Sequence, residues 1–342
     1  MSEFRKDPVI GRWVIISSER GKRPDDFITV PVETKNTGCP FCPGFEHKTP
    51  PEILAFRDSN SQPDTPGWHV RVVRNKFPAL APEGELEVQK YGVFESTSGI
   101  GAHEVFIETP DHNQAFEDLE QKHILHILES YNSRFNSLAC DSRLRYVLIF
   151  KNVGERAGAS LSHSHSQLIA TPQIPKRIRE ELRGAADYYN KHNDCIFCKI
   201  IQTEIQADER LVFENSHYMA FCPYASRFPF EMWFMPKKHQ PYFHHENPES
   251  MKSLASALKS TLQILNTGLK SPQYNFMMHT GPLRFGKTQY GKTVERDFHW
   301  HIEIIPRLVH TAGFEWGSGF YINPTPPEDA AEFLRKVKIN CL

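Results

Sequence analysis

The 342-residue sequence lacks any apolar run near the roughly 18 residues that a membrane-spanning helix requires. MSEFRKDPVIGRW at the amino terminus mixes charged and apolar residues, so we expect no signal peptide. A strong excess of charge is missing as well, since the formal net charge is −1 at pH 7. We therefore expect a cytoplasmic protein that binds neither membranes nor nucleic acid.

Cysteine is scarce and odd in number, which argues against a framework of disulfides. Four of the seven cysteines form two Cys-x-x-Cys pairs, Cys39–Cys42 and Cys195–Cys198. A redox pair usually opens a helix behind a strand, and the sequence predicts no helix directly after either pair. We therefore predict zinc at both pairs, with some of the 17 histidines as further ligands. The alternative is that these cysteines are small buried side chains.

Strand and helix patterns alternate along a chain long enough for about two domains. Expected strands cover 12–18, 69–75, 103–110 and 145–152, then 210–215, 218–223, 230–236, 274–280 and 298–306. Helices are expected at 115–138, 175–190 and 248–268. Each half carries Cys-x-x-Cys, a histidine and His-x-His in the same order, which predicts two divergent repeats. The corresponding domains would be 1–190 and 191–342.

Each repeat contains four candidate zinc ligands of the sulfur and nitrogen type that structural zinc prefers. The first set is Cys39, Cys42, His112 and His163, and the second set is Cys195, Cys198, His239 and His299. In HWHIE, His301 and Glu303 follow His299 at strand spacing. With His279 and either Glu180 or Glu181, they would form an additional metal site or a buried polar cluster without an ion.

The stretch SLSHSHSQLIATP carries the strongest signal for catalysis. In a strand, His163, His165 and Gln167 share one face. A neutral imidazole attacks phosphorus without prior deprotonation, so His165 is a candidate nucleophile. Gln167 can donate an amide N–H to a phosphoryl oxygen, and the Gly-rich turn before it ends in Ser160, a further donor. The alternative is a polar edge strand of histidine and serine.

Eight segments resemble the galactose-1-phosphate uridylyltransferase family, part of the histidine-triad superfamily. They are RKDPVIGRWVII, ERGKRP, CPFC, VVRNKFPAL, TPDH, FKNVGERAGASLSHSHSQLIATP, PFEMWFMPKKH and FHWHIEIIP. The resemblance covers about residues 4–338. It implies an α+β fold of two histidine-triad-like repeats, each an antiparallel sheet, or half-barrel, with flanking helices.

The resemblance also implies roles for individual residues. His165 would carry the nucleotidyl group, and Cys39, Cys42, His112 and His163 would hold structural zinc. The implied substrate-binding residues are Gln167, Ser160, Arg20, Arg23, Asn75, Asn152, Phe314 and Glu315. The implied reaction is a ping-pong exchange in which a nucleotide sugar donates a nucleoside monophosphate and a sugar 1-phosphate accepts it. Such enzymes are homodimers whose active sites draw on both subunits.

The sequence departs from the usual family pattern at the nucleophile, where His-Ser-His-Ser-Gln replaces His-Pro-His-Gly-Gln. SHSHSQ and the ending GFEWGSGFYINPTPPEDAA resemble a branch that includes plant ADP-glucose phosphorylase. We expect a UDP-glucose:hexose 1-phosphate uridylyltransferase, with an ADP-glucose phosphorylase that uses inorganic phosphate as the alternative. CIFC favours a second zinc over the iron-type site of other members, with iron as the alternative.

Two further classes remain open at this point. A two-zinc scaffold that has lost catalysis would have no reason to retain both His165 and Gln167. A histidine-triad nucleotide hydrolase would be helped by a third histidine that protonates the leaving group, and an amide at position 167 does this poorly. The sequence therefore favours group transfer over hydrolysis.

Overall fold

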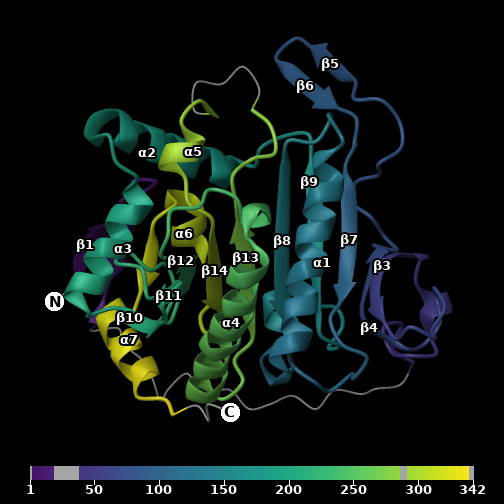
Figure 1. Cartoon of the computed structure of the whole chain (residues 1–342). Coiled ribbons are helices and arrows are strands. Elements are labelled where there is room, and N and C mark those ends of the chain that lie inside the picture. Colours follow the sequence, from purple (N-terminus) through teal and green to yellow (C-terminus); the bar gives the residue numbers. More distant parts are fainter. Residues whose placement is uncertain (1, 19–37, 286–290, 339–342) are drawn as a thin grey trace.

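A ten-stranded antiparallel sheet forms the centre of the protein (Figure 1), in a computed structural model that describes residues 2–18, 38–285 and 291–338. The first half contributes β3 (Glu52–Arg57), β4 (Trp68–Arg74), β7 (Ala102–Ile107), β8 (Tyr146–Val153) and β9 (His165–Thr171). The second half contributes β10 (Leu211–Glu214), β11 (Tyr218–Phe221), β12 (Met232–Pro236), β13 (Tyr274–His279) and β14 (His301–Pro306). The two five-stranded sets join where β13 pairs with β8.

The strand order is the same on both sides of this junction. Outward from the centre, the first half runs β8, β9, β7, β4, β3 and the second half runs β13, β14, β12, β11, β10. The strands that begin with the second histidine of each His-x-His, β9 and β14, therefore occupy corresponding places. The mixed architecture agrees with the α+β class expected from the sequence.

Helices cover the sheet because alternate strand residues are apolar on each face. One face packs against α1 (Gln121–Ala139) and α4 (Pro248–Leu269), which contact each other and share the largest core. On the other face, α2 (Lys176–His192) and α3 (Ile196–Ala207) pack against the second half of the sheet. Among the described residues, no helix has both the length and the apolar character needed to cross a membrane.

Smaller elements surround the sheet. They are β1 (Glu3–Lys6), β2 (Trp13–Ile16) and β15 (Tyr321–Asn323) in a three-stranded sheet, the β5 (Val88–Tyr91)–β6 (Phe94–Thr97) hairpin, the short helices α5 (Val294–Asp297) and α6 (Gly313–Ser318), α7 (Pro327–Arg335), and the 3₁₀ turns η3 (Glu46–Lys48), η4 (Phe116–Asp118), η5 (Glu155–Ala157) and η6 (Phe243–His245).

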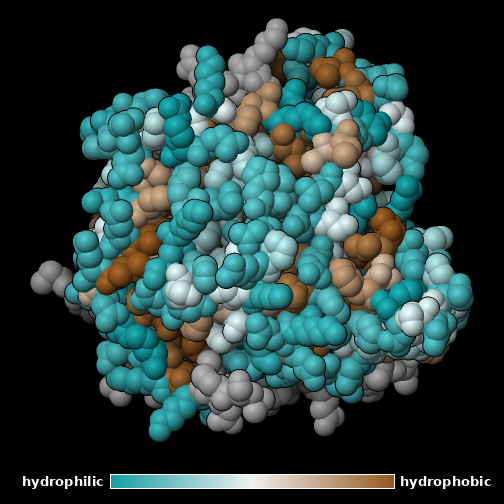
Figure 2. Space-filling view, in the orientation of Figure 1, coloured by the Kyte–Doolittle hydropathy of each residue, from teal (hydrophilic) through white to brown (hydrophobic). Residues whose placement is uncertain are grey.

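Figure 2 shows a mostly hydrophilic face, with an apolar patch over the β5–β6 hairpin at the upper right. Tyr91, Val93 and Phe94 are exposed there.

Two expectations about the elements were wrong in detail. A helix does follow the second cysteine pair, because α3 starts directly after Cys195 and buries Ile196, Phe197 and Ile201 along one side. The first turn of the helix expected at 115–138 is instead the separate 3₁₀ turn η4, and α1 begins at Gln121. The expected domain boundary at residue 190 lies near the end of α2, which ends at His192.

Candidate active site

The four predicted ligands of the first zinc set converge beside the start of β9. Cys39, Cys42, His112 and His163 each offer one ligand atom, all within 4.8 Å of one another. The Cys39 Sγ–His163 Nδ1 distance is 3.7 Å, and Cys42 Sγ lies 3.4 Å from His112 Nδ1 and 3.6 Å from His163 Nδ1. A tetrahedral zinc with ordinary Zn–S and Zn–N bonds separates sulfur and nitrogen by about 3.6 Å. The donor set therefore fits structural zinc.

Outer hydrogen bonds orient these histidines for metal binding through Nδ1. His163 Nε2 lies 2.7 Å from the Thr109 carbonyl oxygen, and His112 Nε2 lies 3.1 Å from Ser162 Oγ. Because the Thr109 carbonyl can only accept, His163 Nε2 carries the proton and its Nδ1 lone pair faces the cysteines. The Ser162 hydroxyl can accept from His112 Nε2–H in the same way. Such contacts are typical of metal-ligating histidine.

The second set repeats this arrangement. Cys195, Cys198, His239 and His299 also lie within 4.8 Å of one another, with Cys198 Sγ 3.3 Å from His239 Nδ1 and 3.8 Å from His299 Nδ1. His239 Nε2 lies 3.1 Å from the Glu295 carbonyl oxygen, and His299 Nε2 lies 2.8 Å from that of Pro236. Both predicted ligand sets are thus assembled by the tertiary structure.

His165 opens β9 on the face of the sheet opposite α1 and is 6% exposed. Its Nδ1 lies 2.8 Å from the His163 carbonyl oxygen, so Nδ1–H donates and the lone pair is on Nε2. Burial lowers the pKa of His165 below the ordinary value. The ring of Phe41, between the two cysteines of the first set, lies 5.4 Å from the His165 ring. Phe41 therefore connects the first Cys–His set to the His165 imidazole through a direct ring contact.

Two of the predicted polar residues adjoin His165 in the sheet. Gln167 lies two residues further along β9 on the same face, and its Oε1 is 2.9 Å from His103 Nε2. Asn152 lies on β8, where its Oδ1 accepts a hydrogen bond from Asn275 Nδ2 at 2.8 Å. The Asn152 amide nitrogen is therefore the end left for another partner.

A short loop between β8 and β9 carries Ser160. Gly154 and Gly158 adopt φ values of +83° and +89°, which favour glycine, and the turn η5 lies between them. Ser160 is exposed within this loop, three residues before the predicted zinc ligand His163.

The serines of the motif point away from His165, toward α1. Ser164 Oγ donates to Glu108 Oε2 at 2.7 Å, and Ser166 Oγ lies 2.7 Å from the hydroxyl of Tyr131. Lys151 Nζ forms an ion pair with Glu108 and donates to Ser164 Oγ at 2.9 Å and to the His165 carbonyl oxygen at 3.1 Å. The Lys151 ammonium group is therefore buried in this network.

Lys151→Met should lower the free energy of unfolding by about 3–5 kcal/mol, because it leaves the Glu108 carboxylate buried without its charge partner. Urea denaturation followed by circular dichroism measures this change. Lys76→Met, at an exposed lysine, is the control and should change stability by less than about 0.5 kcal/mol. Adding Glu108→Gln to Lys151→Met should recover part of the loss, and a Lys151→Met protein as stable as wild type would contradict the interpretation.

Asn75, Phe314 and Glu315 are the remaining predicted substrate-binding residues that the structure describes. Arg20 and Arg23 fall outside the described residues. Asn75 follows β4, and its Nδ2 is 3.5 Å from Gln167 Oε1. Phe314 and Glu315 lie on α6, where Phe314 is exposed and Glu315 Oε2 accepts the Ala312 backbone N–H. Within the described part of the chain, no recorded hydrogen bond or ring contact joins either α6 residue to His165.

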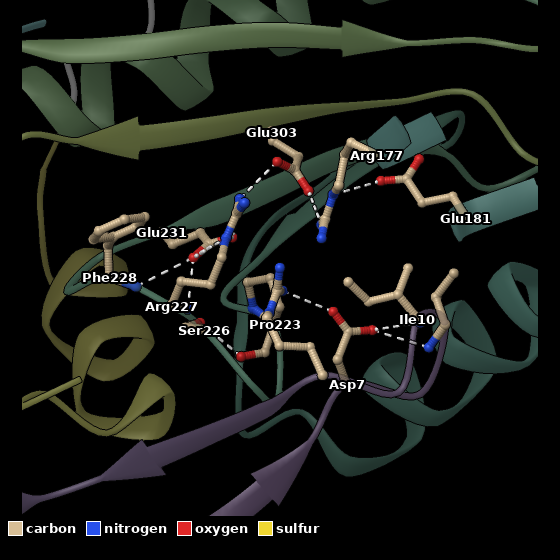
Figure 3. Close-up of polar contacts among 12 residues, drawn as sticks. Asp7, Ile10, Arg177, Glu181, Pro223, Ser226, Arg227, Phe228, Glu231 and Glu303 are labelled. Carbon is tan, nitrogen blue, oxygen red and sulfur yellow. Dashed lines mark hydrogen bonds and ion pairs between the residues drawn. The ribbon is translucent and has the colours of Figure 1, made fainter. Parts of the chain in front are cut away.

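The residues of the candidate third metal site form ion pairs and hydrogen bonds with one another and with nearby arginines. Glu181, His279, His301 and Glu303 lie within 4.8 Å of one another. Figure 3 shows Arg177 and Arg227 reaching Glu303 from two sides, with donor–oxygen distances of 3.0 and 2.6 Å. Both Glu181 oxygens lie 3.1 Å from His279 Nδ1. Each Glu303 oxygen thus accepts from a guanidinium, as in a buried polar network, whereas His301 Nε2 is buried without a hydrogen-bond partner among the described residues. The four residues are therefore compatible with either of the two expected arrangements.

Two residues of the site had no predicted role. Phe41 packs on His165 as Phe197 packs on His301, at 5.4 Å in each case. CPFC and CIFC both contain a phenylalanine between their cysteines, and this shared residue could have predicted the contact. His103 was placed on a strand without a role, because its contact with Gln167 depends on how β7 pairs with β9.

The chain matches known proteins over nearly its whole length. Residues 1–175 match the family model of the galactose-1-phosphate uridyl transferase N-terminal domain, and residues 119–338 match that of a domain of unknown function. The chain is 38% identical to ADP-glucose phosphorylase of Arabidopsis thaliana, covering 98% of this chain and 93% of the relative. It is 29% identical to galactose-1-phosphate uridylyltransferase of Thermotoga maritima, covering 99% of each. The crystal structure of the Arabidopsis enzyme with bound ADP-glucose matches with a TM-score of 0.83 at 35% identity, over 99% of this chain and all of that one.

These relatives and the shared fold define the class: the protein is a nucleotidyltransferase. Matches of this extent also identify its lineage. The chain belongs to the galactose-1-phosphate uridylyltransferase family.

Proposed function

We propose that this enzyme transfers a nucleoside monophosphate in two displacements at His165. In the first, His165 Nε2 attacks the α-phosphorus of a nucleotide sugar, the P–N bond forms, and the P–O bond to the sugar 1-phosphate breaks. In the second, a phosphate oxygen of the acceptor attacks the same phosphorus and releases the imidazole. Each step exchanges one bond at phosphorus, and no oxidant or reductant is needed.

The hydrogen bond from His165 Nδ1 to the His163 carbonyl oxygen carries this proposal. It leaves Nε2 as the atom with a lone pair, as an imidazole nucleophile requires. Gln167 would bind the transferred phosphoryl group through its amide nitrogen, with Asn152 and Ser160 as further donors. Arg20, Arg23 and Asn75 near the nucleotide, and Phe314 and Glu315 at the sugar, remain predictions from family resemblance.

Zinc is the metal proposed for both Cys–His groups, because two thiolates and two imidazoles suit tetrahedral zinc. A metal with four protein ligands has no open position for substrate, so it would act by holding the chain. At the first group it would fix His163 and, through the carbonyl of that residue, His165. Iron at the second group is the alternative that metal analysis would test.

The donor we expect first is UDP-glucose with a hexose 1-phosphate such as galactose 1-phosphate as acceptor. Support comes from the family model and from relatives named galactose-1-phosphate uridylyltransferase. ADP-glucose with inorganic phosphate is the second candidate. It is supported by the higher identity to ADP-glucose phosphorylase, 38% against 29%, and by the ADP-glucose-bound structure.

Incubation with each nucleotide sugar separately, followed by intact-protein mass spectrometry, tests the donor. We expect one UMP per chain from UDP-glucose, and release of the adduct as UDP-glucose when glucose 1-phosphate is added. AMP transfer from ADP-glucose, discharged by orthophosphate as ADP, would instead establish the second candidate. Heat-denatured protein is the control, and the absence of any adduct from either donor would contradict the proposed function.

The domain division at 1–190 and 191–342 is part of the proposal, as are a homodimer and a cytoplasmic location. The matching strand orders about the β13–β8 junction support two repeats. Because the junction is a continuous strand pair, we expect the two domains to unfold in one transition.

A further inference from the structure

The hydrogen bonds of His103 determine the tautomer of its ring. The Ala79 backbone N–H donates to His103 Nδ1 at 3.1 Å, so this nitrogen must carry a lone pair. The proton of the neutral ring is therefore on Nε2, which lies 2.9 Å from Gln167 Oε1. His103 thus donates to the carbonyl oxygen of the Gln167 side chain.

Asn75 also directs an N–H group toward the side-chain oxygen of Gln167. Its Oδ1 accepts the Phe77 backbone N–H at 2.9 Å, which directs Nδ2 toward Gln167. Nδ2 lies 3.1 Å from His103 Nε2 and 3.5 Å from Gln167 Oε1. Because His103 Nε2 carries the proton, it cannot accept from Asn75 Nδ2, and Gln167 Oε1 is the acceptor that both donors share. A reversed Gln167 amide would face these donors with its own N–H groups. The amide nitrogen is therefore the end of Gln167 that remains for a ligand.

We propose that His103 is a positioning residue for nucleotidyl transfer, because it fixes which end of the Gln167 amide faces the phosphoryl group. The inference rests on the proposed function of His165 and Gln167. A reversed amide would present its oxygen to the phosphoryl oxygens, and their repulsion would rise as negative charge develops there. Holding the amide in advance removes the need for it to reorient during the reaction.

His103→Met keeps a similar volume and removes the donor, whereas His103→Gln places an amide N–H near the position of Nε2. We expect His103→Met to slow adduct formation at saturating donor by roughly 10- to 100-fold with little change in KM. His103→Gln should restore most of the rate. Equal thermal stability of the two variants would exclude a general folding defect. Wild-type rates in His103→Met, or equal losses in both variants, would overturn the proposal.

A double-mutant cycle and a spectroscopic readout complete the test. In a Gln167→Ala background, His103→Met should have almost no further effect, and independent losses would overturn the coupling. Nitrogen NMR of the histidine rings in the full-length protein should show His103 as the Nε2–H tautomer. An Nδ1–H tautomer would overturn the assignment. The NMR result does not depend on turnover, so failure of the proposed function is distinguished from failure of this inference.

Discussion

His165→Gly will abolish the nucleotidylated protein and reduce turnover by roughly four orders of magnitude or more, as removal of a covalent nucleophile does elsewhere. In the double-displacement proposal, the phosphoryl group has no other attachment point on the enzyme. Single-turnover assays with labelled donor measure both quantities. Added imidazole should restore part of the activity in this variant, because it can occupy the space of the missing ring. Near wild-type turnover without imidazole would contradict the mechanism.

The second half of the chain provides an internal control for that experiment. His301 occupies the place on β14 that His165 has on β9, and its Nδ1 lies 3.1 Å from the His299 carbonyl oxygen. His301 is fully buried, however, and the Trp233 ring stacks on it at 4.9 Å. A nucleotide cannot reach Nε2 through this contact, so peptide mapping should place every adduct on His165. An adduct on His301 would contradict the expectation that burial and the Trp233 contact keep nucleotides from this residue.

Cys39→Ser and Cys195→Ser form a matched pair that tests the two metal groups. Wild-type protein should contain about two zinc ions per chain, and each variant should contain about one, as measured by inductively coupled plasma mass spectrometry. Both should be destabilised by several kcal/mol, because zinc bound only by the folded state contributes its binding free energy to folding. Thermal unfolding measures this loss.

The two variants should differ in catalysis. Cys39→Ser disturbs His163, whose carbonyl oxygen holds His165, and Phe41, which packs on the same ring. We expect its adduct formation to fall by roughly 10- to 100-fold. Cys195 belongs to the group beside β14, so Cys195→Ser should retain most of the rate at a temperature where it is folded. Equal losses of rate, or metal content unaffected by both changes, would contradict this division of roles.

Spacing within short segments made much of the site predictable. Strand periodicity put His165 and Gln167 on one face, and both lie on β9. Each Cys-x-x-Cys pair supplies two ligands at a fixed separation. The repeated order of cysteines and histidines also indicated which histidines would complete each set. The start of α3 directly after Cys195 was missed, because a short apolar run such as IFCKII fits a strand and a helix equally well.

The sequence by itself thus determined the α+β class, the candidate nucleophile His165 and the composition of the two Cys–His groups. Only the tertiary structure decided that both halves share one sheet, that Lys151 pairs with Glu108 behind β9, and that His103 meets Gln167. It also decided that Arg177 and Arg227 occupy the carboxylate of Glu303. These contacts join segments up to 126 residues apart, for Arg177 and Glu303, and depend on strand register and helix packing. Local patterns along the chain do not encode which distant side chain will face a given residue.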